Sequence, residues 1–210
     1  EAVTSTEANP GADAILVSVG NYPLTNGQLS VTQDLEVSRV GAGSATISGD
    51  DASRIFNVSG AGTDLSLRFL TLKDGRVSGA GPSFGGAIRG GTGTTITIAS
   101  TSVSDSEASA DSDARGGAIY TDGALTIGLA SGSLTGSAIT ANSASTTVGG
   151  SAQGGAVAVG ATGSLTVGSR TTISGNTATQ SGGGIYNAGV LNVTSSTISG
   201  NTAGTFGGGI

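Results

Sequence analysis

The residues best equipped for chemistry lie in one short stretch of this sequence, 102–115, with a further aspartate just beyond it. They are Asp105, Glu107, Asp111, Asp113, Arg115 and Asp122. Carboxylate oxygens are the ligands that Ca²⁺ prefers, and two carboxylates form the usual acid and base of polysaccharide cleavage. The stretch is rich in Ser and Ala, and its spacing differs from that of an EF-hand. We expect a solvated acidic loop here, and the alternative is a calcium site made by Asp105, Glu107, Asp111 and Asp113.

A second group of candidate binding residues consists of arginines in the first half of the chain. They are Arg39, Arg54, Arg68, Arg76 and Arg89. Because a guanidinium forms bidentate hydrogen bonds with carboxylates, a row of arginines could bind acidic glycans. Aspartates are as frequent in this half, and we expect the arginines to pair with them at the surface. The expected partners are Asp34, Asp50, Asp51, Asp64 and Asp74.

The composition excludes several classes of function. The chain of 210 residues has neither Cys nor His, so thiolate catalysis, Ser-His-Asp triads and zinc sites of the usual kind are excluded. The net charge of −6 argues against nucleic acid, whose binding depends on Lys and Arg. No apolar run approaches the ~20 residues that span a bilayer. We therefore expect a soluble protein that is not an enzyme and needs no cofactor.

Five near-copies of one tetrapeptide divide the second half of the chain, starting at positions 85, 116, 154, 182 and 207. Each has two glycines, then Ala or Gly, then Ile or Val. A motif that recurs about every 20 to 50 residues is typical of repeat proteins, whose units bury their apolar faces by stacking. The residues to which we assign this structural role are Gly86, Ile88, Gly117, Ile119, Gly155, Val157, Gly183, Ile185, Gly208 and Ile210.

Short segments with alternating apolar residues accompany the tetrapeptides, three to a repeat, and no stretch shows a helical period. Three short strands per unit without a helix predict an all-β fold, a right-handed parallel β-helix. Apolar segments open at positions 15, 35, 55, 88, 119, 157 and 185. They predict about seven coils of three short strands, with an eighth coil begun at Ile210.

The glycine pairs and three asparagines have a physical purpose in such a fold. A Gly-Gly corner lets stacked backbones approach closely, and the following Ile or Val points inward. Asn142, Asn176 and Asn201 each follow an isoleucine by three residues. Asn tolerates turn geometry, and stacked Asn side chains form hydrogen bonds between coils. We therefore expect these asparagines to be structural.

The chain is predicted to be a single β-helix domain, 1–210. Residues 1–84 form the first coils without the tetrapeptide, and residues 85–210 carry the Gly-Gly repeats. An excursion at 128–150 is rich in Ser, Thr and Ala, and such insertions map to loops on one side of a solenoid. We expect an uncapped C-terminal end, so that the natural protein continues or a partner's coil completes it.

At these residues the chain resembles bacterial secreted and outer-surface β-helix proteins. The tetrapeptides with Ile139-x-x-Asn142, Ile173-x-x-Asn176 and Ile198-x-x-Asn201 are similar to polymorphic outer-membrane-protein and autotransporter-passenger repeats, which carry Phe where this chain has Ile. Residues 9–13, 20–22, 41–43 and 70–72 are similar to the opening coils of secreted repeat proteins with a Cys-Ser-Leu-Arg-Glu-Ala motif, which this sequence lacks. The resemblance implies a surface scaffold or adhesin outside a bacterial cell.

Two hypotheses of function follow. The first is a non-enzymatic, extracellular structural or adhesin-like protein at the bacterial cell surface. Its partners would be copies of itself stacked end to end in a filament, or host and cell-surface glycans or proteins. The alternative is a glycan-binding or polysaccharide-cleaving β-helix that uses the acidic stretch 105–115. Convergence of the acidic side chains with Arg115 in one groove would favour the alternative.

Overall fold

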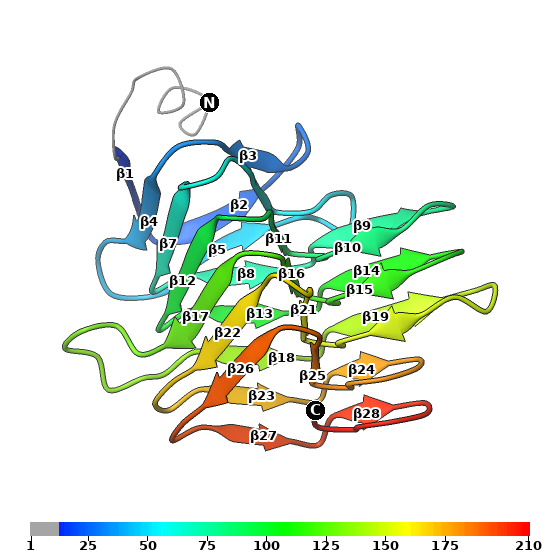
Figure 1. Ribbon diagram of the computed structural model, residues 1–210. Helices are drawn as coiled ribbons and strands as arrows, with labels where there is room; N and C mark the ends of the chain where they lie inside the picture. Colours follow the sequence, from blue (N-terminus) through cyan, green and yellow to red (C-terminus); the bar gives the residue numbers. More distant parts are fainter. Residues whose placement is uncertain (1–12) are drawn as a thin grey trace.

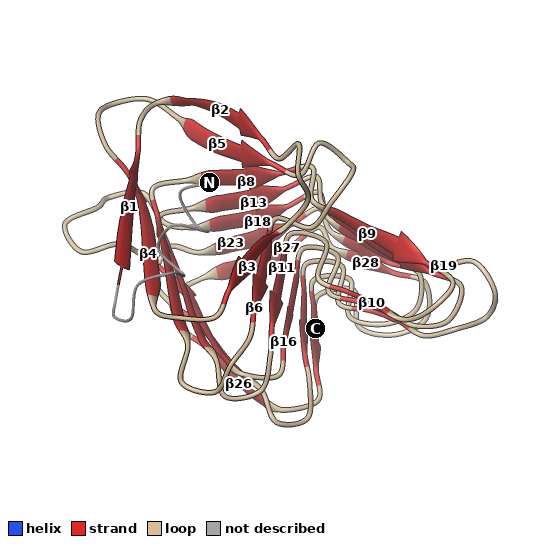
Figure 2. Ribbon diagram, turned by 90° about the horizontal axis from the view of Figure 1, so that it is seen from above, coloured by secondary structure: helices blue, strands red, loops and turns tan. Residues whose placement is uncertain are grey.

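The computed structural model describes residues 13–210, which fold into a parallel β-helix without any helical element (Figure 1). Each coil passes through three sheets, A, B and C, and successive coils pair in parallel. Seen from the N-terminal end, the chain runs clockwise as it recedes, so the coils are right-handed (Figure 2). Sheets A and B each contain seven strands, which confirms the prediction of about seven coils. No helix able to cross a membrane occurs in the described part of the chain.

Sheets A, B and C form the walls of the coil. Sheet A contains β1 (Asp13–Val17), β4 (Leu35–Arg39), β7 (Asp64–Arg68), β12 (Thr95–Ala99), β17 (Ala124–Gly128), β22 (Ser164–Val167) and β26 (Val190–Val193). Sheet B contains β2 (Gly20–Pro23), β5 (Ala45–Ser48), β8 (Thr71–Lys73), β13 (Ser102–Ser104), β18 (Ala138–Thr140), β23 (Thr172–Ser174) and β27 (Thr197–Ser199). Sheet C contains β3 (Leu29–Val31), β6 (Phe56–Val58), β11 (Ile88–Gly90), β16 (Ile119–Thr121), β21 (Val157–Val159) and β25 (Ile185–Asn187).

Alternating side chains of the three walls point inward and stack on their equivalents one coil away. In sheet A, for example, Ile96 pairs with Leu65 on one side and with Leu125 on the other. These side chains are buried, as are their counterparts in sheets B and C. Burial of each Leu or Ile stabilises the fold by roughly 1.5–3 kcal/mol relative to exposure. Since each coil repeats the same few positions, aliphatic stacking fills the thin interior.

A two-layered wing, sheets D and E, extends the last five coils between sheets B and C (Figure 2). Sheet D contains β9 (Arg76–Gly79), β14 (Glu107–Ala110), β19 (Ser143–Thr146), β24 (Thr177–Ala178) and β28 (Thr202–Ala203). Sheet E contains β10 (Ser83–Phe84), β15 (Ala114–Arg115) and β20 (Ala152–Gln153), continued by bridges at Ser181 and Phe206. The wing has its own small core of buried alanines: Ala110, Ala114, Ala144, Ala152 and Ala178. The prediction of three strands per coil therefore holds for the walls, and the wing adds two more.

The coil register that we predicted for the first half is wrong in part. Positions 15 and 35 lie in sheet A, but position 55 precedes β6 in sheet C. The partner of Leu35 in the next coil is Leu65, and Ile15 pairs with Val37. All three walls carry the same alternating apolar pattern, so spacing alone does not reveal the wall to which a segment belongs. Positions 1–12 of the predicted domain lie outside the described residues.

Candidate functional site

The acidic stretch 102–115 forms strands instead of the loop that we expected. Glu107 lies in β14, Arg115 lies in β15, and Asp111 and Asp113 occupy the turn between them. Asp105 lies at the bend after β13, where its φ is 53°. The reason for the error is that alanine takes the inward positions of β14, with the pattern of exposure alternating along the strand. Alanine is too weakly apolar for this alternation to be recognised as a strand.

The acidic side chains do not converge. Glu107 pairs with Arg76, with 3.3 Å between Oε2 and Nη2. Asp113 pairs with Arg115 at 3.6 Å, and the Thr147 hydroxyl donates to Asp111 Oδ1 at 2.6 Å. Among residues 13–210, no three Asp or Glu side chains are arranged to hold a metal ion. Neither the calcium site at Asp105, Glu107, Asp111 and Asp113 nor a convergent acidic groove is supported by this geometry.

The expected pairing of the first-half arginines with nearby aspartates is also wrong. Arg68 lies 3.7 Å from Glu36, and Arg76 contacts Glu107. Arg54 donates through Nε and Nη2 to the carbonyl oxygens of Gly85 and Phe84, each at 2.9 Å. Burial, with the charge of Arg89 adding to it, lowers the pKa of Arg54 to about 10. Through these hydrogen bonds, Arg54 links the corner before β6 to the end of β10, at the base of the wing.

The three asparagines form a column at the bend between sheets B and D. Asn142 Nδ2 donates to Asn176 Oδ1 at 2.9 Å, and Asn176 Nδ2 donates to Asn201 Oδ1 at 2.9 Å. Each side-chain oxygen also accepts from the backbone N–H of the preceding coil's asparagine, at 3.0 Å in both steps. Ser106 occupies the same place one coil earlier, where its backbone N–H donates to Asn142 Oδ1. The column satisfies polar backbone groups that the bend would otherwise leave buried and unpaired.

The tetrapeptides stack on one another directly. The backbone N–H groups of Gly182, Gly183, Gly184 and Ile185 donate to the carbonyl oxygens of residues 206–209 at 2.9–3.0 Å. The first glycine of each copy has a positive φ, between 61° and 72°. These contacts make the tetrapeptides a structural column at the junction of sheets E and C, rather than a binding motif.

Two aromatic rings join sheet E to sheet C at the base of the wing. The rings of Phe84 in β10 and Tyr120 in β16 stack with their centroids 4.8 Å apart. Tyr120 is almost fully buried, and its hydroxyl donates to Asp122 Oδ2 at 2.8 Å. Burial raises the pKa of Tyr120 to about 12, with the hydrogen bond to Asp122 and that carboxylate's charge adding to the effect.

This environment predicts a late tyrosine titration. We expect Tyr120 to ionise near pH 12, and Asp122→Asn to lower that pKa, because the amide carries no negative charge. A pKa raised on folding means that this contribution to stability is complete below about pH 10 and is lost as the pH rises through about 12. Near-ultraviolet absorbance of the parent minus that of Tyr120→Phe isolates the transition, since the chain has no Trp. A difference titration centred near pH 10 would contradict the assignment.

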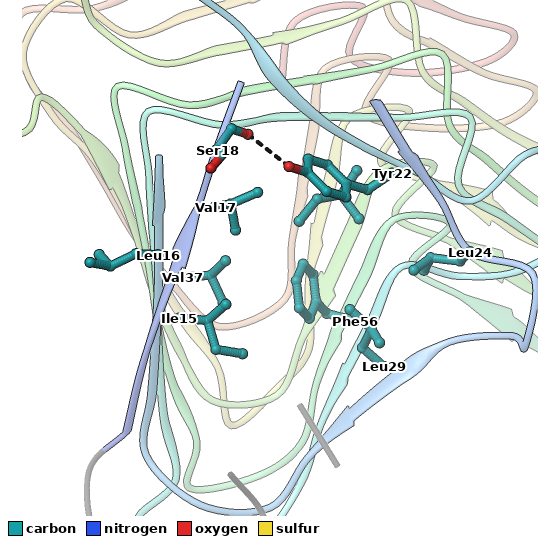
Figure 3. Close-up of a pocket in the computed structure, with 10 residues that line it drawn as sticks. Ile15, Leu16, Val17, Ser18, Tyr22, Leu24, Leu29, Val37 and Phe56 are labelled. Atoms are coloured by element: carbon teal, nitrogen blue, oxygen red, sulfur yellow. Dashed lines mark hydrogen bonds between the residues drawn. The ribbon is translucent and has the colours of Figure 1, made fainter. Parts of the chain in front are cut away.

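The N-terminal end of the interior opens into an apolar pocket of about 370 Å³. Figure 3 shows Ile15, Val17 and Val37 facing Phe56 and Leu29, while Leu16 points away from them. The Tyr22 hydroxyl donates to the carbonyl oxygen of Ser18 at 3.0 Å and closes one side. We name this the end pocket; it is the continuation of the core beyond the first described coil.

A second pocket, of about 380 Å³, lies where sheet A turns into sheet B, and we name it the corner pocket. Its lining comes from four successive corners: 39–44 after β4, 69–71 after β7, 100–102 after β12, and 133–138 after β17. Arg39 and Phe69 line it together with several hydroxyl side chains. No carboxylate lines it. This concave surface is the candidate binding site of the molecule.

Sequence reasoning found only part of this site. Arg39 was among the arginines considered for acidic glycans, but Phe69, Ser133 and Thr135 were missed. The available signal was the excursion 128–150, which in the structure contains a corner loop, β18, and the wing strand β19 with the turn after it. Only the corner loop and the first residue of β18 reach the corner pocket.

The segment that contains Ile173, Asn176 and the fourth tetrapeptide runs from β23 through β24 to β25. Residues 170–188 match the Chlamydia polymorphic membrane protein repeat. The match covers the part of one coil that runs from sheet B to sheet C, without a strand of sheet A, and it includes Asn176 of the asparagine column and one tetrapeptide. Polymorphic membrane protein repeats are repeats of bacterial outer-membrane proteins, in agreement with the resemblance found from the sequence. The comparisons with curated proteins and with solved structures gave no match.

Proposed function

We propose that this chain is a non-enzymatic, extracellular part of a bacterial surface protein and acts as an adhesin-like scaffold. The observation that carries the proposal is the match of residues 170–188 to a polymorphic membrane protein repeat, in a segment that forms part of one coil of a continuous β-helix. Because the strands of sheets A and B pair in register through seven coils, the geometry of the matched coil extends along the described chain.

The outer surface suits a protein that acts by binding. In the last coils of sheet B, the outward positions carry hydroxyl side chains in register: Thr140, Ser174 and Ser199 in one row. After Asp122 the sequence has one charged residue, Arg170. Among the acidic groups considered for catalysis, Glu107, Asp111 and Asp113 each contact a separate partner. A rigid rod with a polar, nearly neutral surface presents binding loops at fixed positions.

The proposal is tested by adhesion of the bacterium that makes the protein. We expect deletion of the gene to reduce attachment to its target surface several-fold, and expression of the full gene to restore it. Beads coated with the purified chain should bind the same surface, whereas beads coated with serum albumin should not. Equal attachment of the deletion and complemented strains, together with equal binding of both kinds of bead, would refute the adhesin role.

End-to-end stacking of copies is a second candidate, favoured by the apolar end pocket. A second copy's last coil would extend the parallel sheets and cover the partly exposed side chains of the end pocket, such as Ile15 and Val17. Negative-stain electron microscopy at rising protein concentration tests it. Filaments one coil wide support stacking, and separate short rods at the highest concentration exclude it.

A further inference from the structure

The corner pocket owes its shape to unequal corners between sheets A and B. The corners after β7 and β12 are short, whereas the ones after β4 and β17 are longer loops, which flank them. The two longer loops therefore form opposite walls, and the short corners form the floor. At about 380 Å³ the space lies within the range of pockets that bind small molecules.

The loop after β17 is a fixed wall. Ser100 Oγ donates to the Thr135 carbonyl oxygen at 2.6 Å and accepts from the Ala130 N–H at 3.0 Å. From the next coil, Arg170 Nη1 donates to the Leu134 carbonyl oxygen at 2.8 Å. These bonds hold the loop from both sides, so the pocket is formed before a ligand arrives.

Arg39 supplies an unsatisfied hydrogen-bond donor inside the molecule. Its Nη1 donates to the Gly43 carbonyl oxygen, and its Cζ lies 5.8 Å from the centroid of the Phe69 ring. Its Nε is buried and has no hydrogen-bond partner. The side chain as a whole is only partly buried and lines the corner pocket, so its other N–H groups are the donors within reach of an acceptor from outside.

Phe69 is held in an unusual backbone conformation. Its φ is 58°, a left-handed value that costs energy for a bulky side chain. The residue is partly exposed beside the pocket, and its N–H donates to the Ala99 carbonyl oxygen at 3.2 Å. Ser100 and Arg170, which lie two residues before their own strands of sheet B as Phe69 does, have similar φ values of 50° and 59°, so this conformation belongs to the corner of the coil. Here it places an aromatic ring beside Arg39.

The rest of the lining is rich in hydroxyl groups. The side-chain oxygens of Ser44, Thr71 and Ser102 make no hydrogen bond to any of residues 13–210. A sugar ring presents hydroxyl groups that exchange hydrogen bonds with such side chains, and its apolar face packs on an aromatic ring. One guanidinium without a carboxylate in the lining selects for a negative charge on the ligand.

We propose that the corner pocket binds a carboxylate-bearing sugar residue of an acidic saccharide. The Arg39 guanidinium donates to the carboxylate, Phe69 contacts the ring, and Ser44, Thr71 and Ser102 hydrogen-bond to its hydroxyl groups. The pocket replaces the acidic stretch 105–115 as the saccharide site of the molecule. Binding at the pocket does not depend on display of the protein at the cell surface. The further statement that the saccharide is the target of adhesion rests on the proposed function.

Isothermal titration calorimetry of the purified chain with trigalacturonate tests the proposal. The methyl ester of the same trisaccharide keeps the rings and removes the charge. We expect the ester and the variant Arg39→Gln each to weaken binding about tenfold or more, because a charge-assisted hydrogen bond is lost. The matched control is Arg68→Gln, an arginine of the next coil that pairs with Glu36 outside the pocket, and it should bind like the parent.

A second variant guards against a folding defect. Ser44→Tyr, at an exposed loop position, should fill the pocket and abolish binding while the circular dichroism spectrum stays unchanged. Sialyllactose in place of trigalacturonate distinguishes an animal-cell source of the carboxylate from a plant source, and tighter binding of either supports the pocket. Equal affinity for acid and ester, binding that survives both Arg39→Gln and Ser44→Tyr, or no binding of either acidic saccharide would overturn the proposal.

Discussion

Gly117→Ala is expected to destabilise the protein by about 3 kcal/mol or more. A Cβ atom at Gly117 would overlap the carbonyl oxygens of Gly155 and Ser143, which belong to the next coil. Both obstacles are backbone atoms held by the stacked coils, so neither can move without breaking hydrogen bonds between coils. The midpoint of urea unfolding, followed by far-ultraviolet circular dichroism, measures the loss.

Gly128→Ala is the matched control for this substitution. Gly128 ends β17, has no positive φ, and a Cβ atom there would meet no heavy atom within 4 Å. We expect its unfolding midpoint to stay within the range of ordinary surface changes, about 0.5 kcal/mol. If Gly117→Ala unfolded at the same urea concentration as Gly128→Ala, the close stacking of the tetrapeptides would be refuted.

Asn176→Ala is expected to cost about 2–4 kcal/mol, since it removes the middle of the asparagine column. Asn176 is fully buried, and its Oδ1 accepts from both the backbone and side-chain nitrogens of Asn142. Its Nδ2 also donates to the Ile139 carbonyl oxygen at 3.0 Å. Alanine would leave the Asn142 backbone N–H buried without a partner and would remove one of the three hydrogen bonds that Asn142 Nδ2 donates. Equilibrium unfolding in urea gives the change in stability.

The control for the asparagine column is Asn192→Ala. Asn192 is exposed on the outer face of β26 and makes no side-chain hydrogen bond with the described residues. We expect a change within about 0.5 kcal/mol at this position. Comparable losses at positions 176 and 192 would mean that the column does not stabilise the coils.

The walls of the β-helix could be predicted because their signals are strong and repeated. Five tetrapeptides fixed a repeat, and Ile or Val after each glycine pair marked an inward position such as Ile119, which is fully buried. The expected hydrogen bonds between asparagine side chains are present in the structure. For positions 15, 35 and 55 the only signal was their spacing in the sequence, and we wrongly placed the three segments in the same wall. The error arose because sheets A and C carry the same alternation of apolar and polar residues.

The wing could not be predicted because its core is made of alanine. In β14 the inward residues are Ala108 and Ala110, and the outward ones include Glu107. Periodicity is recognised by the contrast between strongly apolar and polar residues, and Ala beside Ser gives little contrast. Two closely packed sheets need small inward side chains. The alanines that allow the wing to pack therefore also remove the apolar pattern by which its strands could be recognised in the sequence.

The candidate site could not be predicted because residues that are far apart in sequence meet there. Arg39 and Thr135 come from corners that follow β4 and β17, three strands apart in sheet A, and only the stacking of coils brings them to one pocket. Charge density pointed to 105–115 instead, where Glu107 pairs with Arg76 on the neighbouring strand of sheet D and Asp113 pairs with Arg115. In a solenoid, a site forms where corners of successive coils lie next to one another. The spacing of motifs in the sequence predicts only approximately which corners these are.

Surface labelling of intact bacteria tests the central claim most directly. Antibodies raised against the purified chain would be applied to unpermeabilised cells of the bacterium that makes it, with the gene-deletion strain as control. The account predicts labelling of intact cells that permeabilisation does not increase and that protease added outside removes. Labelling that appears only after permeabilisation, with full protection from external protease, would contradict a protein that acts at the cell surface.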